Sequence, residues 1–264
     1  MNNISFPGLG ISVDVSPVAA KLPFVGEVHW YGVIIGIGIL LAFLYCSYFA
    51  KKEGISADTL ADLVIYALPV AIICARTYYV VFSWDYYGKH LEDIVKIWNG
   101  GLAIYGGIIG AVITGVIFCK IKKLEILKVF DICCLGLMIG QMIGRWGNFV
   151  NAEAFGGYCT NILRMSINGA EPVHPAFLYE SLWNLTGLII LSFLHKKRPF
   201  NGFTFFSYIS WYGVGRFIIE GLRTDSLYIG NIRVSQLVAL LCIIGGIAAL
   251  SFLSEKSISK KTGK

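Results

Sequence analysis

The sequence predicts an all-α polytopic membrane protein with seven transmembrane helices. The chain has 264 residues, of which 56% are hydrophobic and 14% charged. Its mean hydropathy of +0.69 indicates more apolar surface than one soluble core could bury. Apolar stretches of about 17–25 residues recur along it, the length that crosses roughly 30 Å of hydrocarbon at about 1.5 Å per helical residue. Basic residues gather after alternate stretches.

The predicted spans follow one another along the whole chain. They cover residues 29–50, 60–82, 101–119, 129–148, 175–194, 203–221 and 234–253. The polar stretch between the fourth and fifth spans is rich in Gly and Asn, which is typical of an irregular loop, so we expect an external loop at about 149–174. We expect residues 1–264 to form a single integral membrane domain.

Lys and Arg residues follow the first, third, fifth and seventh spans. These residues are Lys51, Lys52, Lys120, Lys122, Lys123, Lys128, Lys196, Lys197, Arg198, Lys256, Lys260, Lys261 and Lys264. Because short cytoplasmic loops carry the excess of positive charge, the N-terminus is predicted outside and the C-terminus in the cytoplasm. The net charge of +6 is mostly this flanking charge, and no basic patch interleaved with aromatic residues indicates a nucleic acid partner.

Two glycine series predict helix faces that pack closely, since small residues let helices approach. They are Gly136-x3-Gly140-x3-Gly144 and Gly32-x3-Gly36. The seven cysteines show neither a disulfide framework nor the spacing of a metal site. We expect them to be small core residues, and we expect no metal and no cofactor.

Polar side chains gather at the end of the fourth span. Arg145, Asn148, Asn151 and Glu153 come directly after an apolar stretch over 132–143. Such groups at the edge of the hydrocarbon need partners or a water-filled cavity. They therefore indicate a functional pocket.

The sixth span carries a second polar group. Tyr212, Arg216, Glu220 and Arg223 are spaced by four, four and three residues, so they share one helix face. In the predicted orientation this face and Arg145 meet at the outer level of the membrane. The alternative is that Arg216 and Glu220 form an ion pair that only fixes helix packing.

Two outer helix starts add candidates. Tyr31 opens the first span, and His174 precedes the fifth, where Pro175 suits a first helical turn. His174 is either a structural histidine or a proton carrier. Glu180 lies deeper, and we expect it to pair with Arg76 of the second span.

Arginines at the outer level suggest an anionic ligand. Guanidinium groups match phosphate oxygens in a bidentate manner, which predicts a phospholipid headgroup reached from the membrane. If the lipid is cleaved, the same arginines can stabilise the charge that develops on the departing phosphate.

Other membrane functions use different patterns. A transporter or flippase for an anionic lipid or solute is the alternative, although the charged groups stay toward one level and no inverted repeats with broken helices are found. An intramembrane protease is disfavoured, because neither Gly-x-Ser-Gly nor His-Glu-x-x-His occurs.

Several short motifs follow one another in order along the chain. They are His29-Trp30-Tyr31-Gly32, Gly100-Gly101 to Gly106-Gly107, Gly144-Arg145-x-Gly147-Asn148-Phe149-x-Asn151-x-Glu153-x-x-Gly156, His174-Pro175 to Leu178-Tyr179-Glu180, Tyr212-Gly213-x-x-Arg216-x-x-x-Glu220-x-x-Arg223, and Ser235-Gln236. In this order and spacing they resemble the signature of the bacterial prolipoprotein diacylglyceryl transferase family. The resemblance covers nearly the whole chain.

The resemblance implies a seven-helix enzyme of the bacterial plasma (inner) membrane, with its active site toward the extracytoplasmic side. Members of the family move a diacylglyceryl group from phosphatidylglycerol to the lipobox cysteine thiol of prolipoprotein signal peptides. The transfer forms a thioether, releases glycerol phosphate and is the first step of lipoprotein maturation. The implied partners are therefore phosphatidylglycerol, the prolipoprotein signal peptide and membrane lipid.

The resemblance also implies roles for residues. Arg145 and Arg216 would be the phosphate-facing catalytic pair. The substrate-binding residues around them would be Tyr31, Asn148, Asn151, Glu153, Gly156, His174, Tyr212, Glu220 and Arg223.

One position departs from the family pattern. Many members have a histidine, proposed as the base for the thiol, where this chain has Tyr105. A phenol is a poor base at neutral pH, so we expect Tyr105 to hydrogen-bond lipid or peptide at the catalytic centre. A thiol with its ordinary pKa of about 8.5 is already a few per cent thiolate, and nearby arginines raise that fraction, so a dedicated base is dispensable.

Overall fold

The computed structural model describes residues 1–23, 26–224 and 226–262, with side chains described as far as Ser259. Lys264 and the side chains of Lys260 and Lys261, part of the predicted basic tail, lie outside the described residues. The chain is mostly helical and falls into two compact units. The first unit comprises residues 1–46 and 130–264, and the second unit comprises residues 47–129.

In the described part of the chain, a long helix lies at each of the seven predicted spans. These helices are α1 (Trp30–Lys52), α2 (Ala57–Phe82), α4 (Ile104–Ile121), α5 (Ile126–Asn151), α6 (Ala176–Lys196), α7 (Phe203–Glu220) and α8 (Val234–Thr262). Their ends agree with the prediction to within three residues, except that α8 extends to Thr262 instead of ending near residue 253.

Among the described residues, six of these helices are long and apolar enough to cross a membrane. The set does not include α7, an 18-residue helix that carries Arg216 and Glu220 together with several Ser and Tyr residues. The protein is therefore a multi-pass membrane protein with at least these six apolar helices.

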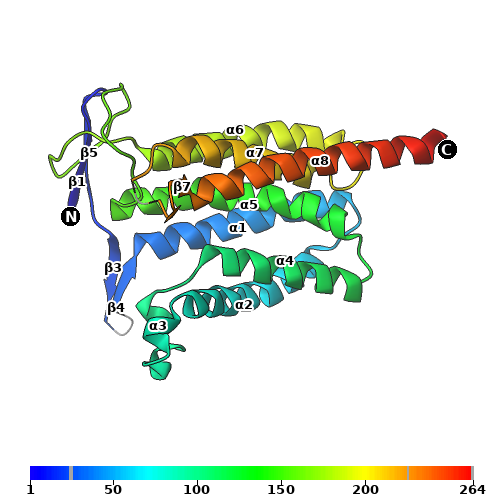
Figure 1. Ribbon diagram of the computed structural model, residues 1–264, viewed down its shortest axis with the longest axis horizontal. Coiled ribbons are helices and arrows are strands. Elements are labelled where there is room, and N and C mark those ends of the chain that lie inside the picture. Colours follow the sequence, from blue (N-terminus) through cyan, green and yellow to red (C-terminus); the bar gives the residue numbers. More distant parts are fainter. Residues whose placement is uncertain (24–25, 225, 263–264) are drawn as a thin grey trace. The chain divides into compact units, whose positions relative to one another are not determined.

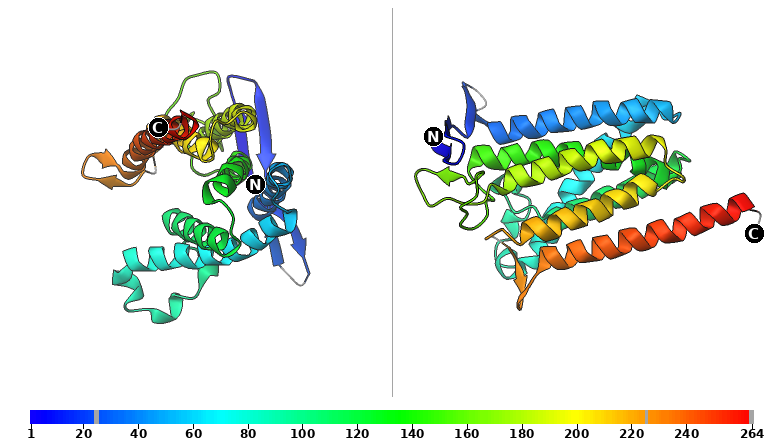
Figure 2. Two further views of the ribbon diagram at one scale, coloured as in Figure 1. Left: turned by 90° about the vertical axis from the view of Figure 1, so that its right-hand side faces the viewer. Right: turned by 90° about the horizontal axis from the view of Figure 1, so that it is seen from above.

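Within the first unit, α7 packs between α6 and α8, and the three helices run side by side in both views (Figures 1 and 2). The indole rings of Trp183 on α6 and Trp211 on α7 stack at 4.4 Å, and each N–H donates to the other residue's carbonyl at 3.1 Å. Across the other face of α7, a Cβ added at Gly213 would lie 2.7 Å from the carbonyl oxygen of Ala239, so glycine is needed for this approach.

Gly136 and Gly144 of the α5 series lie close to α1, whereas an added Cβ at Gly140 would meet nothing within 4 Å in the described residues. A Cβ at Gly136 would lie 2.5 Å from the sulfur of Cys46, and a Cβ at Gly38 would lie 3.9 Å from the Cα of Gly140. In the described part of the chain, nothing lies within 4 Å of where a Cβ would stand at Gly32 or Gly36. All seven cysteines are described, and none forms a disulfide.

The start of α7 is fixed by a buried carboxylate of α5. Asp131 accepts hydrogen bonds from the backbone N–H groups of Gly202 and Phe205, both at 2.8 Å. It also pairs with Arg198 at 3.2 Å. A carboxylate at a helix N-terminus satisfies donors that have no partner within the helix. These contacts fix the start of α7 relative to α5. They thereby also fix how far along α5 the residues at the other end of α7 lie.

Short strands, which the sequence analysis did not foresee, precede the first helix and flank the loops. They are β1 (Asn2–Phe6), β2 (Ile11–Val15), β3 (Val18–Leu22), β4 (Gly26–His29), β5 (Ser166–Ile167), β6 (Tyr228–Ile229) and β7 (Ile232–Arg233). The sheet of order β2-β1-β5 is antiparallel, with Ile4 opposite Ile167, so it joins the N-terminus to the loop after α5. Ile4, Met165 and Phe177 form its buried core, against which Phe149 packs. This core therefore lies against the end of α5 and the start of α6.

The second unit is built on the pair α2 and α4. Their connection contains α3 (Trp84–Tyr87) and two short 3-10 helices, η1 (Leu91–Asp93) and η2 (Ile97–Asn99). A Cβ at Gly106 of α4 would lie 2.6 Å from the Cβ of Tyr78 on α2, so the two helices approach closely at this point.

Buried Arg76 of α2 holds the connection. Its guanidinium donates to the carbonyls of Asp93 at 2.6 Å, Ile94 at 2.8 Å, Gly100 at 2.7 Å and Gly101 at 3.0 Å. Gly101 has a φ of 76°, and a Cβ there would lie 2.6 Å from Nη1 of Arg76. Glycine is therefore required here for two reasons: it adopts a positive φ without strain, and it leaves room for the Arg76 guanidinium.

Candidate active site

A buried carboxylate at the start of α6 gathers three arginines within the first unit. Oε2 of Glu180 pairs with Nη2 of Arg145. Oε1 of the same carboxylate lies 3.6 Å from Nη1 of Arg216 and 3.5 Å from Nη1 of Arg223. Arg145 comes from α5, Arg216 from α7 and Arg223 from the segment after α7. Residues from three helices and one loop therefore meet at one carboxylate that is only 7% exposed.

A second carboxylate holds Arg216 from the side. Oε2 of Glu220, one turn further along α7, lies 2.7 Å from Nη2 of Arg216, and Ser235 at the start of α8 lies 3.4 Å from the same nitrogen. The ion pair between Arg216 and Glu220, which their spacing offered as the alternative to a functional role, is present. The five side chains joined by these ion pairs, three arginines and two glutamates, carry a formal charge of 3 − 2 = +1.

A chain of hydrogen bonds leads from Arg145 to the loop after α5. Nη1 of Arg145 donates to the amide oxygen of Asn148 at 3.4 Å. The amide nitrogens of Asn148 and Asn151 donate to Oε1 of Glu153 at 2.9 and 3.3 Å. The four polar residues predicted at the end of the fourth span thus form one connected group.

The turn that carries Glu153 has an unusual backbone. Ala152 and Ala154, on either side of it, have φ values of 54° and 55°, in the left-handed region that L residues other than glycine seldom adopt. The backbone N–H of Glu153 donates to the carbonyl of Asn148 at 3.0 Å. Strained turns of this kind often belong to functional sites, where the surrounding contacts hold them in place.

The aromatic ring of Tyr31 lies against α5. A Cβ at Gly147 would stand 2.7 Å from Cδ2 of Tyr31, so the ring occupies space that any other residue at 147 would fill. Gly147 lies between Arg145 and Asn148 on the chain. The ring of Tyr31 is therefore in contact with the α5 backbone near its end, where Arg145 and Asn148 also lie.

Gly156 ties the loop after α5 to the segment that carries Arg223. Its N–H donates to the carbonyl of His174 at 2.9 Å, and it bridges to Arg223 in an antiparallel manner. A Cβ at Gly156 would lie 2.7 Å from both the Cβ of His174 and the carbonyl oxygen of Leu222. No larger residue fits without separating these segments.

His174 belongs to this scaffold. Its backbone bonds to Gly156 and Gly157, and Nδ1 of its ring lies 3.3 Å from the hydroxyl of Tyr179. These contacts favour the structural interpretation over that of a proton carrier.

Arg233, which the sequence analysis did not single out, fixes the end of α7. Its guanidinium donates to the carbonyls of Glu220 and Arg223, and its Nε donates to the hydroxyl of Tyr228 at 2.8 Å. Basic side chains at a helix C-terminus satisfy carbonyls that have no partner within the helix. Arg233 thereby holds Arg223 close to α7 and adds positive charge beside the ion-paired group.

Comparison with known proteins identifies the family of the chain. A sequence profile of the prolipoprotein diacylglyceryl transferase family matches residues 17–252. The chain belongs to this family. The match includes every candidate residue named above.

Individual relatives cover most of the chain. A phosphatidylglycerol–prolipoprotein diacylglyceryl transferase of Lysinibacillus sphaericus (strain C3-41) is 46% identical over 254 residues, which are 91% of this chain and 93% of the relative. Proteins of the same name from Finegoldia magna and Geobacillus kaustophilus are 48% and 47% identical, over 90% and 84% of this chain and 96% and 86% of their own lengths.

Two tyrosines of the family motifs remain to be located, Tyr212 and Tyr105. Tyr212 lies one turn before Arg216 on α7, with its ring 6.3 Å from that of Tyr208. Tyr105 lies in the first turn of α4, in the second unit, with its ring 6.4 Å from that of Tyr78.

The predicted pairing of Glu180 with Arg76 is wrong. Arg76 donates to four backbone carbonyls of the second unit, and Glu180 pairs with three arginines of the first. A signal was present in the sequence, because Glu180 is the only acidic residue of α6 and a lone carboxylate in an apolar helix needs cationic partners. Spacing along one helix could not show which arginines those are.

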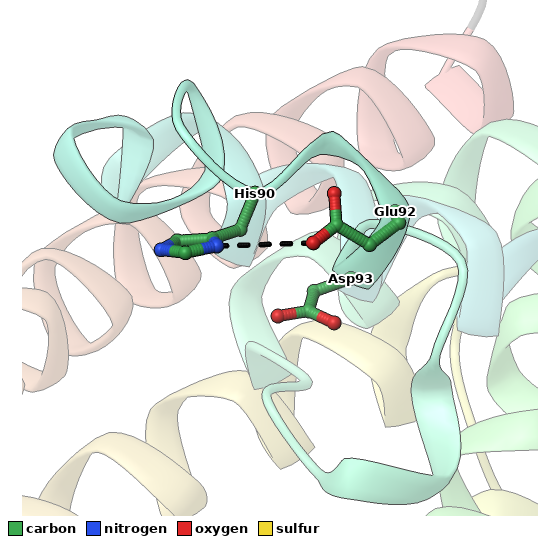
Figure 3. Close-up of side chains that lie close together, drawn as sticks. All are labelled: His90, Glu92 and Asp93. Carbon is green, nitrogen blue, oxygen red and sulfur yellow. Dashed lines mark ion pairs between the residues drawn. The ribbon is translucent and has the colours of Figure 1, made fainter.

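Three polar side chains also gather near η1 of the second unit (Figure 3). Ligand atoms of His90, Glu92 and Asp93 lie within 4.8 Å of one another. However, Asp93 accepts hydrogen bonds from Lys96 and from the hydroxyl of Tyr86, both at 2.7 Å. Both bonds lower the pKa of the Asp93 carboxyl, and the bond from Lys96 has the larger effect. Because Lys96 already neutralises this carboxylate, we assign no metal to the cluster.

Proposed function

We propose that the protein transfers the diacylglyceryl group of phosphatidylglycerol to the lipobox cysteine of prolipoprotein signal peptides. The names of the relatives give both substrates, phosphatidylglycerol and prolipoprotein. The observation that carries the proposal is the convergence of Arg145, Arg216 and Arg223 on one buried carboxylate, at the family's own motif residues. Neither the family nor the names of the relatives favour the transporter or flippase alternative.

The reaction follows as a displacement at carbon. The cysteine thiolate attacks the glycerol C3 carbon of the lipid, the C–S bond forms, and the C–O bond to phosphate breaks. The electron pair of that bond leaves with the phosphate oxygen as glycerol phosphate. Arg145 and Arg216 would stabilise the charge that builds on this phosphate, the kind of interaction that lowers a barrier by several kcal/mol.

The thiol proton needs no strong base on the protein. Positive charge around the site favours the thiolate, which is already present at a few per cent for a thiol with a pKa of about 8.5. The proton then passes to solvent as the thiolate forms. Tyr105 would hydrogen-bond the lipid or the peptide instead of accepting this proton.

The other family residues would bind substrate around the arginines. Asn148, Asn151 and Glu153 form a polar rim that continues from Arg145, and amides there can contact lipid ester or peptide groups. The same role would fall to Tyr31, Gly156, His174, Tyr212, Glu220 and Arg223. Of these, Glu220, Gly156 and His174 act by holding an arginine or its segment in place.

The membrane topology belongs to the same proposal. We infer that α7 is a seventh span, because its 18 residues are about 27 Å long and its charged groups have partners within the first unit. Basic residues lie at or just beyond the ends of α1, α4 and α6 and in the C-terminal part of α8. They favour an N-terminus outside and a C-terminus in the cytoplasm of a bacterial plasma (inner) membrane. The arginine group, at the ends of α5 and α7 and the start of α6, would then face the extracytoplasmic side, within one integral domain over residues 1–264.

A reconstituted assay separates the transferase from the transporter. Purified protein in vesicles of phosphatidylglycerol is offered a lipobox peptide, and both covalent lipid on the peptide and movement of lipid between leaflets are measured. Cysteine-linked lipid that depends on the protein supports the proposal. Protein-dependent lipid movement without a covalent product contradicts it and selects the flippase.

A further inference from the structure

Glu180 is placed to organise the arginine group, a role that the spacing of the motifs did not suggest. Three guanidinium groups carrying like charges repel one another and would separate without an anion between them. Glu180 is the carboxylate that contacts all three: Oε2 meets Arg145, and Oε1 faces Arg216 and Arg223. The arginine side chains are 11–26% exposed, so internal contacts, with Glu180 for all three and also with Glu220 for Arg216, hold them more than solvent does.

The two oxygens of Glu180 make unequal contacts. The Oε2 side is in close contact with Arg145. On the Oε1 side, the distances of 3.6 Å to Arg216 and 3.5 Å to Arg223 exceed the 2.7–2.9 Å of a charge-assisted hydrogen bond. Another anion can therefore replace Oε1 as a partner of these two arginines at little cost, while the contact with Arg145 persists.

We propose that Glu180 is a positioning residue that holds the three arginines around the place of a phosphate and yields its looser contacts when the phosphodiester of the lipid binds. A phosphate group offers two or more anionic oxygens to guanidinium groups, as the carboxylate does. Glu180 also sets the charge of the group, since its loss raises the formal charge of the five side chains from +1 to +2. This inference rests on the proposed function and names the residue that prepares the same site.

Glu180→Gln tests the inference, because it keeps the shape of the side chain and removes its charge. Turnover of lipobox peptide is measured in phosphatidylglycerol micelles, together with inhibition by added glycerol phosphate. We expect kcat to fall at least about tenfold because the arginines separate, whereas KM for phosphatidylglycerol stays equal or falls because the site becomes more positive. Glycerol phosphate should inhibit the variant several-fold more tightly, which a purely structural role would not produce.

Two further variants keep the test decisive. Glu180→Asp retains the charge on a side chain that is shorter by one methylene. Its kcat should fall, while its inhibition by glycerol phosphate should equal that of the wild type. This variant tests the inference if Glu180→Gln does not fold. Glu171→Gln, at an exposed residue of the loop after α5, is the matched control and should behave as the wild type. Wild-type kcat in Glu180→Asp, or a raised KM with unchanged kcat in Glu180→Gln, would overturn the inference.

The wild-type protein distinguishes this inference from the proposed function. If the wild type forms no thioether product, the proposed function fails. If the wild type is active and the two Glu180 variants equal it, only the role of Glu180 fails.

Discussion

Nη2 of Arg216 lies 2.7 Å from Oε2 of Glu220, one turn further along α7. Glu220 is only 1% exposed, and the carbonyl of the same residue accepts a hydrogen bond from Arg233. The end of α7 is thus held from two sides, and the guanidinium of Arg216 has a fixed direction. A charged group that is fixed before substrate binds does not have to reorganise during the reaction, which is the condition for effective electrostatic catalysis.

Replacing either phosphate-facing arginine should therefore abolish most activity. Arg145→Ala and Arg216→Ala each remove a charge that would stabilise the leaving phosphate, and loss of such a group typically costs about 100-fold or more in kcat. The rate of thioether formation by purified protein measures the effect. Arg164→Ala is the control, because the donors of Arg164 reach the carbonyls of Thr160 and Asn161 in the loop after α5. Full activity in either alanine variant would refute the role of that arginine.

Tyr105→Phe should keep substantial activity. The substitution removes the hydroxyl and leaves the ring, so it costs at most about one hydrogen bond to substrate, or roughly tenfold in rate. The pH dependence of kcat/KM in the variant should match that of the wild type, since in the proposed mechanism the phenol does not act as the base. A loss as large as that of Arg145→Ala, with a changed pH profile, would mean that Tyr105 takes part in proton transfer.

Gly156→Ala should disturb the site through the backbone. The added Cβ would stand 2.7 Å from His174 and from the carbonyl of Leu222, so it pushes the segment with Arg223 away from the loop. A displacement of about 1 Å can cost as much as 100-fold in rate. The neighbouring Gly157→Ala is a matched control, because a Cβ there would meet nothing closer than 3.7 Å. Equal turnover numbers in the two variants would contradict the account of Gly156.

Arg76→Gln should loosen the connection of the second unit. The guanidinium of Arg76 satisfies four backbone carbonyls, and loss of buried hydrogen bonds to a charged group costs about 3 kcal/mol or more. Limited proteolysis should cleave the segment 88–101 faster in the variant than in the wild type. Lys89→Gln, an exposed substitution in the same segment, should leave the cleavage rate unchanged. Cleavage of Arg76→Gln at the wild-type rate would show that the four bonds do not hold this segment.

The helices could be predicted from the sequence because the bilayer imposes length and composition on each span. All seven predicted ranges contain a long helix, and the ion pair of Arg216 and Glu220, which their spacing left as an alternative, is present. The strands near the N-terminus could not be predicted in the same way. β1 and β2 are five residues each, and β5, the partner that joins them to the rest of the unit, is more than 150 residues away.

The sequence indicated the arginines of the ion-paired group but not the carboxylate that joins them. Motif residues such as Arg145 and Asn148 were identified because polar groups in an apolar chain are conspicuous. Glu180 as a common partner of three arginines, and Arg233 as the residue that fixes the end of α7, depend on which helices are neighbours. That information lies in tertiary packing, which a periodicity along one helix does not contain.

The mass of a lipobox peptide after incubation with purified protein and phosphatidylglycerol tests the central claim most directly. We predict that a peptide with the lipobox cysteine gains the mass of one diacylglyceryl group, that free glycerol phosphate accumulates in equal amount, and that a peptide with serine in place of the cysteine gains nothing. An unmodified cysteine peptide in the presence of folded protein and lipid would contradict the account.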